Sequence, residues 1–425
     1  MGRIRPVTET HPAYDYFIYK DGDYYRILNG KSLGIVNKFR DASTAINWAL
    51  SLSDATKVLL GSGTFDIKSQ ITVPSYKVLS GLGYGTQLKL NGPNYGVVVE
   101  DYGCVRDLRV IGDLVTLNQA DIQLKGWFSK AINCLTEKGA DGIILDGVHS
   151  MASNCLAINN NGNGDKIGFL LRAAQGTFIG CKGYQNSTDF YINNADFLVV
   201  GCEAQGADSY PVGFLFAHFT YVGLCVGCVS CHHTDAEFAL DGGHDYLIVG
   251  CQVNHSHGNA FRIRDCNNIV INGLTVWEQL SSTKAAFWIP YDADRIKITN
   301  CIIQSWTYGI KIDDSSCENI EIYNNRFRDV TYPITDVGSG TKIRNNEGFI
   351  TENSGEVTIP AGSSYVDVTH GLDITPSLKN IVLTPLDDLG GRSIWVSDAN
   401  SSTFRINLSS VDSIDHTIGW SYREW

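Results

Sequence analysis

The stretch Phe178-Ile-Gly-Cys181 decides the fold, because variants of it return at regular intervals along the chain. It is followed by Val199-Val-Gly-Cys202, Cys225-Val-Gly-Cys228 and Ile248-Val-Gly-Cys251, so the closing cysteines are 21, 26 and 23 residues apart. A recurring unit of this length is the signature of a stacked-repeat protein. One such unit cannot bury an apolar face alone, so the repeats must stack into one continuous core.

A second short strand is predicted in every repeat, as in Glu237-Phe-Ala-Leu-Asp241 and Ala260-Phe-Arg-Ile-Arg264. Apolar and variable residues alternate there, which places one set of side chains in the core and the other outside. Gly and Asn close the turns between strands. We therefore predict an all-β fold, a right-handed parallel β-helix. The phenylalanines expected inside are Phe190, Phe214, Phe238, Phe261 and Phe287.

Three regions are predicted along the chain. Residues 1–38 contain two strands joined by the turn Lys20-Asp-Gly-Asp23, which is typical of a hairpin. Residues 39–351 form the β-helix, and a short helix with Asp41 as its N-cap closes the first coil. Residues 352–425 change to strands spaced for a small antiparallel β-sandwich.

Composition excludes several classes of partner. The net charge is −12 and only 18% of residues are charged, which argues against nucleic acid and against an anionic membrane surface. No run of 18 apolar residues is present, so no membrane span is predicted. We expect an extracellular or virion-associated protein, although Met1-Gly-Arg-Ile-Arg-Pro-Val lacks the apolar core of a signal peptide.

The chain has twelve cysteines, and in several repeats a Cys follows Gly or Asn at the same place, which predicts a ladder of buried thiols rather than disulfides. Cys225, Cys228 and Cys231 form a C-x2-C-x2-C run that resembles a metal site. Side chains alternate along a strand, so residues three apart are expected to point to opposite sides. We therefore predict no metal site there.

The N-terminal half carries a resemblance to a known family. Asp41-Ala-Ser-Thr-Ala-Ile, Val58-Leu-Leu-Gly-Ser-Gly-Thr-Phe-Asp-Ile and Val78-Leu-Ser-Gly-Leu-Gly-Tyr-Gly-Thr-Gln-Leu resemble the start of the pectate-lyase-like β-helix superfamily. That superfamily includes polysaccharide lyases, polygalacturonases, uronan epimerases and phage tailspikes. The resemblance covers residues 14–350 and implies the fold and a polysaccharide partner, whereas fold alone does not fix the reaction.

Polar residues that can carry chemistry gather on outward positions between residues 230 and 315. Arg262 and Arg264 are two apart and so emerge on one face; Asp241 is expected one coil from Arg264, and His232 one coil from His255. A lyase acting on a uronic acid must neutralise its carboxylate, remove the adjacent proton and protonate the leaving oxygen. We predict that the arginines hold the acidic sugar, Asp241 orients an arginine, and the histidines act as base or acid.

Aromatic rings on the same coils offer flat apolar faces on which a sugar can stack. Isolated exposed aromatic residues are ordinary, but a cluster of them usually marks a binding surface. The predicted substrate-binding residues are Trp277, Trp288, Tyr291, Trp306, Lys311, Tyr191 and Glu278.

Hydrolysis is the competing reaction and requires two carboxyl groups about 5–9 Å apart. Ser256-His-Gly258 and Arg262-Ile-Arg264 partly resemble elements of polygalacturonases, but their other acidic elements are missing, as is the Asp-Pro-His signature of mannuronan epimerases. No cluster of Asp ligands is evident, so no cofactor is predicted and Ca²⁺ alone stays open. Candidate carboxylates are Asp235, Glu237, Asp241, Asp245, Glu278, Asp292 and Asp294.

Simpler interpretations accompany each of these assignments. Asp241 and Arg264 would also suit a surface ion pair between coils, and His232 with His255 would suit a stacked polar ladder. A second hypothesis is non-catalytic: a glycan-binding or tailspike-type fibre protein. In both cases the partner is a polysaccharide and the protein is a monomer or a homotrimer.

Overall fold

The computed structural model describes residues 14–91, 96–112, 120–160, 166–206, 210–217, 220–280 and 283–423. They form two compact units, which are described separately below. Unit 1 comprises Met1–Tyr246 and Cys251–Arg262, and unit 2 comprises Leu247–Gly250 and Ile263–Trp425. Residues 1–7, which lack the apolar core of a signal peptide, lie outside the described residues. None of the helices within these ranges is long and apolar enough to cross a membrane.

Unit 1 begins with the predicted hairpin. Strands β1 (Tyr16–Asp21) and β2 (Tyr24–Asn29) pair antiparallel, and β2 also pairs with β3 (Ile35–Phe39). Strand β1 pairs in parallel with β4 (Lys57–Leu60), so the hairpin is joined directly to the β-helix. Helix α1 (Ala42–Ser51) starts as predicted, because the Asp41 carboxylate accepts the backbone N–H of Thr44 at 2.7 Å.

The remaining strands of unit 1 form three parallel ladders, with one strand from each coil. In the ladder that carries the phenylalanines, Phe169 lies opposite Phe190, Phe190 opposite Phe214, and Phe214 opposite Phe238. This ladder contains β6 (Ile71–Val73), β9 (Val97–Val99), β12 (Ala120–Leu124), β15 (Asp141–Leu145), β18 (Ile167–Leu171), β21 (Thr188–Ile192), β24 (Val212–Phe216) and the first residues of β27 (Ala236–Val249).

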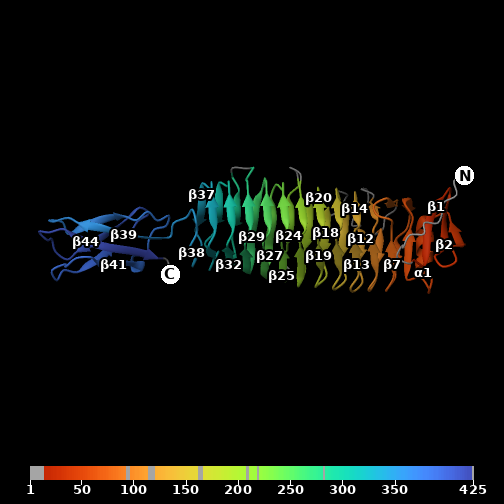
Figure 1. The fold of residues 1–425 in the computed structure, drawn as a ribbon, viewed down its shortest axis with the longest axis horizontal. Helices are drawn as coiled ribbons and strands as arrows, with labels where there is room; N and C mark the ends of the chain where they lie inside the picture. The colour runs from red at the N-terminus through yellow and green to blue at the C-terminus, as the bar shows by residue number, and fades with distance from the viewer. Residues whose placement is uncertain are drawn as a thin grey trace. The chain divides into compact units, whose positions relative to one another are not determined.

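The other two ladders complete each coil (Figure 1). After β4, the first comprises β7 (Val78–Ser80), β10 (Cys104–Arg106), β13 (Lys130–Ile132), β16 (Met151–Ser153), β19 (Thr177–Ile179), β22 (Phe197–Val200) and β25 (Tyr221–Val226). The second comprises β5 (Gly63–Ile67), β8 (Thr86–Leu90), β11 (Arg109–Ile111), β14 (Leu135–Glu137), β17 (Leu156–Ile158), β20 (Lys182–Tyr184), β23 (Glu203–Gln205), β26 (Val229–Cys231) and β28 (Gln252–Asn254).

The predicted inward positions are confirmed. Phe169, Phe190, Phe214, Phe238 and Phe261 are fully buried, and their rings stack from coil to coil with centroids 4.7–4.8 Å apart. In unit 2, Phe287 is also fully buried. All twelve cysteines are thiols, as predicted, and most are buried in a row along the core.

A left-handed turn residue explains the Gly-Cys and Asn-Cys motifs. Gly180 and Gly201 have φ +59°, and Asn154 has φ +52°, a region that Gly enters freely and Asn tolerates. The residue that follows then points into the core, as Cys181 and Cys155 do. This turn is a general device of the repeat, and it recurs at the candidate site.

The same turn corrects one prediction about the cysteines. Gly227, at φ +62°, lies between Cys225 and Cys228 and turns the chain, so both side chains are fully buried rather than pointing to opposite sides. Cys231 lies on β26 and is partly exposed. The argument from strand alternation was wrong because these residues do not share one continuous strand.

Unit 2 continues with parallel strands and then changes to antiparallel ones. The parallel ladders are β29 (Asn259–Asn272), β32 (Ala293–Thr299), β35 (Glu321–Tyr323) and β38 (Lys342–Arg344); β31 (Ala285–Ile289), β34 (Tyr308–Ile312) and β37 (Tyr332–Asp336); and β30 (Thr275–Trp277), β33 (Ile302–Gln304) and β36 (Arg326–Arg328).

Residues from Glu352 onward form the predicted antiparallel β-sandwich. One sheet has the order β39 (Glu352–Ile359), β44 (His416–Arg423), β41 (Ile381–Pro385), and the other β40 (Tyr365–Thr369), β43 (Thr403–Leu408), β42 (Ile394–Ser397). A short 3₁₀ helix, Leu378–Asn380, precedes β41. Both sheets contribute to one core, in which Phe404, Ile406, Ile418 and Trp420 are buried.

Candidate functional site

Arg262 lies on β29 at the centre of a polar cluster on unit 1. Its Nε and Nη2 donate to the two carboxylate oxygens of Asp241 at 2.9 and 2.5 Å, and its Nη1 donates to Asp235. The side chains of Arg262 and Asp241 are only 9% and 11% exposed, whereas that of Asp235 is 40% exposed. Burial lowers the pKa of Arg262, but its bonds with Asp241 and Asp235 outweigh burial and raise that pKa.

This environment does not suit the role predicted for Arg262. Two carboxylates already bind its guanidinium group, and one cation with two anions leaves a net negative charge. Such a group repels a sugar carboxylate rather than holding it. Asp241, expected one coil from Arg264, forms two hydrogen bonds with Arg262. The carboxylate that solvent and a substrate can reach is that of Asp235, which the sequence offered only as one of several hydrolytic candidates.

A histidine trio also lies on unit 1, in the turns that follow β26 and β28. The rings of His232 and His255 stack with centroids 5.7 Å apart and an interplanar angle of 12°, which confirms their placement one coil apart. The ring of His257 lies 6.1 Å from that of His232. His255 is exposed and the other two are partly exposed. Imidazole exchanges protons readily near neutral pH, so this trio can act as acid or base.

Unit 2 carries a group of aromatic and cationic residues, of which Tyr291 is exposed and Arg264, Trp288 and Lys311 are partly exposed. Arg264 donates to the Tyr291 hydroxyl at 3.3 Å, and Trp288 donates its indole N–H to Asp313 at 2.8 Å. Asp313 also accepts from Lys311 at 2.8 Å. The structure thus gathers Trp288 and Lys311 around one carboxylate, and Arg264 beside Tyr291.

The other predicted substrate-binding residues have different environments. Trp277 is 47% exposed, and Glu278 beside it is exposed. Tyr191 is half-buried and packs against an outer apolar cluster that includes Leu170. Trp306 is buried, so the prediction of an exposed ring there was wrong. Ser305 takes the left-handed turn position, at φ +61°, and the residue after such a turn points inward.

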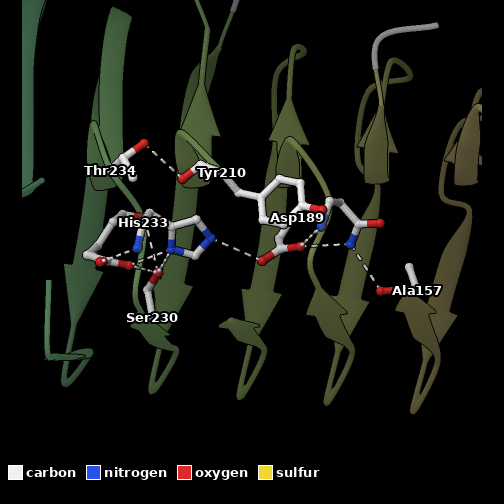
Figure 2. A network of polar contacts seen from close by, with 8 residues as sticks. Ala157, Asp189, Tyr210, Ser230, His233 and Thr234 are labelled. Carbon is white, nitrogen blue, oxygen red and sulfur yellow. Dashed lines mark hydrogen bonds and ion pairs between the residues drawn. The ribbon is translucent and has the colours of Figure 1, made fainter. Parts of the chain in front are cut away.

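Sequence reasoning missed a buried polar network in the core of unit 1 (Figure 2). His233 follows the left-handed turn residue His232 and points inward. Its Nδ1 contacts Glu237 Oε2 at 2.6 Å, and its Nε2 contacts Asp189 Oδ2 at 3.2 Å. Ser230 donates to Glu237 at 2.7 Å. The rule that a residue after a left-handed turn faces the core would have found His233.

The network extends across several coils. Asn186 donates to Asp189 at 2.7 Å and to the carbonyl of Ala157 at 3.0 Å. Burial lowers the pKa of His233, but the carboxylates of Glu237 and Asp189 outweigh it and raise that pKa to about 9. His233 is therefore a protonated, fully buried cation at neutral pH, and its role is to hold strands together rather than to meet a ligand.

Known proteins share this architecture. The family model described as "Right handed beta helix region" matches residues 223–348. No curated protein is found to match the chain in sequence.

Among solved structures, the A-module of the Azotobacter vinelandii mannuronan C-5 epimerase AlgE4 is similar with a TM-score of 0.62 and 12% identity, over 72% of this chain and 96% of that one. The catalytic domain of a GH87 alpha-1,3-glucanase aligns with a TM-score of 0.55 and 11% identity, over 81% and 70%. A tailspike protein of E. coli bacteriophage HK620 aligns with a TM-score of 0.55 and 10% identity, over 90% and 89%. The chain thus has the right-handed parallel β-helix fold.

Proposed function

We propose that this protein is an extracellular or virion-associated enzyme that binds a polysaccharide along its β-helix and cleaves it. Support comes from the neighbours, since a mannuronan epimerase and an alpha-1,3-glucanase use the same fold. It also comes from the outer surface, where His255 on unit 1 and the rings of Trp277 and Tyr291 on unit 2 are exposed.

The observation that carries our choice of reaction is the double pairing of Arg262. β-Elimination needs a cation that neutralises the substrate carboxylate, and Arg262 is already bound by Asp235 and Asp241. Because this guanidinium is occupied, we infer hydrolysis rather than elimination, with Asp235 as the carboxylate that a substrate can reach.

Roles follow from exposure. Asp235 is the reachable carboxylate and acts on water or on the anomeric carbon, while the histidine trio supplies or removes the second proton. Arg262 is a positioning residue, since its guanidinium fixes the directions of both carboxylates. Trp277, Trp288 and Tyr291 offer the stacking faces for sugar rings.

The test is a panel of neutral and uronic-acid polysaccharides incubated with the purified full chain. Hydrolysis gives new reducing ends without the ultraviolet absorbance of an unsaturated uronic acid, whereas elimination gives both. New reducing ends that disappear in Asp235→Asn support the proposal. If the protein binds a glycan but releases no product from any polysaccharide of the panel, the proposal of cleavage would be overturned. The protein would then be a binding or fibre protein, and light scattering would decide whether it is a monomer or a homotrimer.

β-Elimination remains the second candidate, because unit 2 also carries cationic residues beside aromatic rings. Arg264 contacts the Tyr291 hydroxyl, and Lys311 lies over the ring of Tyr308 with its Nζ 5.2 Å from the centroid. These are groups that could hold an acidic sugar beside a base. An unsaturated product that persists in Asp235→Asn but is lost in Arg264→Ala would favour elimination over hydrolysis.

A further inference from the structure

The row of cysteines in unit 1 has one position, at Cys225, where a third sulfur lies beside two others. Along most of the row, each thiol meets only the thiols of the coils before and after it, as Cys181 meets Cys155 and Cys202. Those two partners are two coils apart, about 10 Å, so the three sulfurs cannot surround one ion. Cys225 changes this arrangement, because it adds a sulfur beside Cys228 and Cys251.

These three sulfurs form a triangle. The Sγ atoms of Cys225, Cys228 and Cys251 all lie within 4.8 Å of one another, and those of Cys225 and Cys251 are 3.8 Å apart. Three sulfurs bound at about 2.3 Å to one ion would be separated by about 3.8–4.0 Å. A shift of a few tenths of an ångström in each side chain is therefore enough to bring all three into coordination.

We propose that Cys225, Cys228 and Cys251 form a buried three-thiolate site for a soft metal ion, with Zn²⁺ and Cd²⁺ as the class of ligand. Thiolates select such ions over hard cations such as Ca²⁺ and Mg²⁺. Binding of a divalent ion releases three thiol protons and leaves a complex with a charge of −1. No electron is transferred, and the site needs the thiols in their reduced state.

The position of the site gives it a structural effect. Cys225 and Cys228 flank the turn at Gly227, and Cys251 follows the corresponding turn at Gly250 in the next coil. A bound ion therefore joins two successive coils. All three side chains are buried, so the ion enters during folding or through local opening, and its binding free energy adds to that of folding.

The experiment is to refold the full chain anaerobically with a phosphine reductant and excess CdCl₂ or ZnCl₂, and then to remove unbound metal. We expect about one ion per chain by mass spectrometry, a thiolate-to-cadmium charge-transfer band, and a higher melting temperature than the metal-free protein shows. The decisive variant is Cys225→Val, because Val199 occupies the same ladder position one coil earlier and the fold accepts it. It should hold less than about a tenth of an equivalent.

The matched control is Cys181→Ala, which removes a thiol from the same row but outside the triangle, and it should retain the full stoichiometry. Circular dichroism checks that both variants are folded. Absence of bound metal in the wild-type chain would overturn the proposal. Equal binding in Cys225→Val, or equal loss in both variants, would also overturn it, because the metal would then bind the cysteine row in general.

Discussion

Two cations in unit 1 are each held by two carboxylates, yet their surroundings differ. Arg262 is bound by Asp235 and Asp241 at the outer surface, and His233 is bound by Asp189 and Glu237 in the core. The difference is solvent access: Asp235 is 40% exposed, whereas the His233 group is fully buried. Similar charges therefore leave a reachable carboxylate in one place and join buried strands in the other.

Loss of the exposed carboxylate tests the chemical half of this comparison and should have the largest effect. Asp235→Asn should lower kcat by about 10²–10⁴-fold, since it removes the reachable acid–base group. The free energy of unfolding should change by less than about 1 kcal/mol because this carboxylate is partly exposed. Reducing-end assays and denaturant unfolding measure the two quantities. Asp367→Asn, which breaks an exposed ion pair with Arg405, is the control for charge loss, and equal activity of both variants would contradict the role of Asp235.

Removal of the buried cation tests the structural half. His233→Ala should lower the free energy of unfolding by about 3–5 kcal/mol, because it leaves the carboxylates of Asp189 and Glu237 buried without their cation. Urea unfolding monitored by circular dichroism measures this loss. The neighbouring, partly exposed His232→Ala is the matched control and should cost less than about 1 kcal/mol. Similar losses in the two variants would mean that burial does not distinguish these histidines.

The pH dependence of stability sharpens the same point. The pKa of His233 is raised to about 9 in the folded protein from its ordinary value of 6.5. Its stabilising effect is therefore complete below pH 6.5 and disappears as the pH rises through about 9, a loss of about 3 kcal/mol. Thermal or urea unfolding from pH 6 to 10 under reducing conditions should show this decline. A wild-type profile that matches that of His233→Gln would refute the assignment of a charged His233.

The smallest expected effect concerns sugar binding by the exposed rings. Trp277→Ala should weaken the affinity for the preferred oligosaccharide by about 1 kcal/mol, or five-fold, because a single stacking face is lost. Isothermal titration measures this change. Trp395 is similarly exposed but lies in the C-terminal sandwich, so Trp395→Ala is the matched control. An unchanged affinity in Trp277→Ala would remove that residue from the binding surface.

The sequence predicts the fold well because every coil repeats the same pattern of inward and outward residues. The inward positions of Phe190 and Phe214, the cap at Asp41 and the change of architecture at Glu352 all follow from local pattern. The site is less predictable, because side-chain reach decides it. Arg262 alternates with inward-facing neighbours, as its strand pattern predicts. Its second ion pair, with Asp235, depends on how far a long side chain extends from its own strand.

Turn conformation accounts for the other errors. Trp306, His233 and Cys228 each follow a residue in the left-handed region, at Ser305, His232 and Gly227. For the cysteines, strand alternation was applied across the turn at Gly227 as if the chain were continuous, which placed Cys225 and Cys228 on opposite sides. The alternation of inward and outward side chains holds within a strand of three to five residues and fails at the turns that end it.

The antiparallel hairpin at the start of unit 1 has a consequence for self-association. A parallel coil ends in open backbone donors and acceptors, which would let one molecule continue the ladder of another into a filament. Here β1 occupies the edge of β4, β2 runs antiparallel to β1, and β3 runs antiparallel to β2. The β4 edge is therefore already paired within the chain, and a second molecule cannot add a strand to it directly.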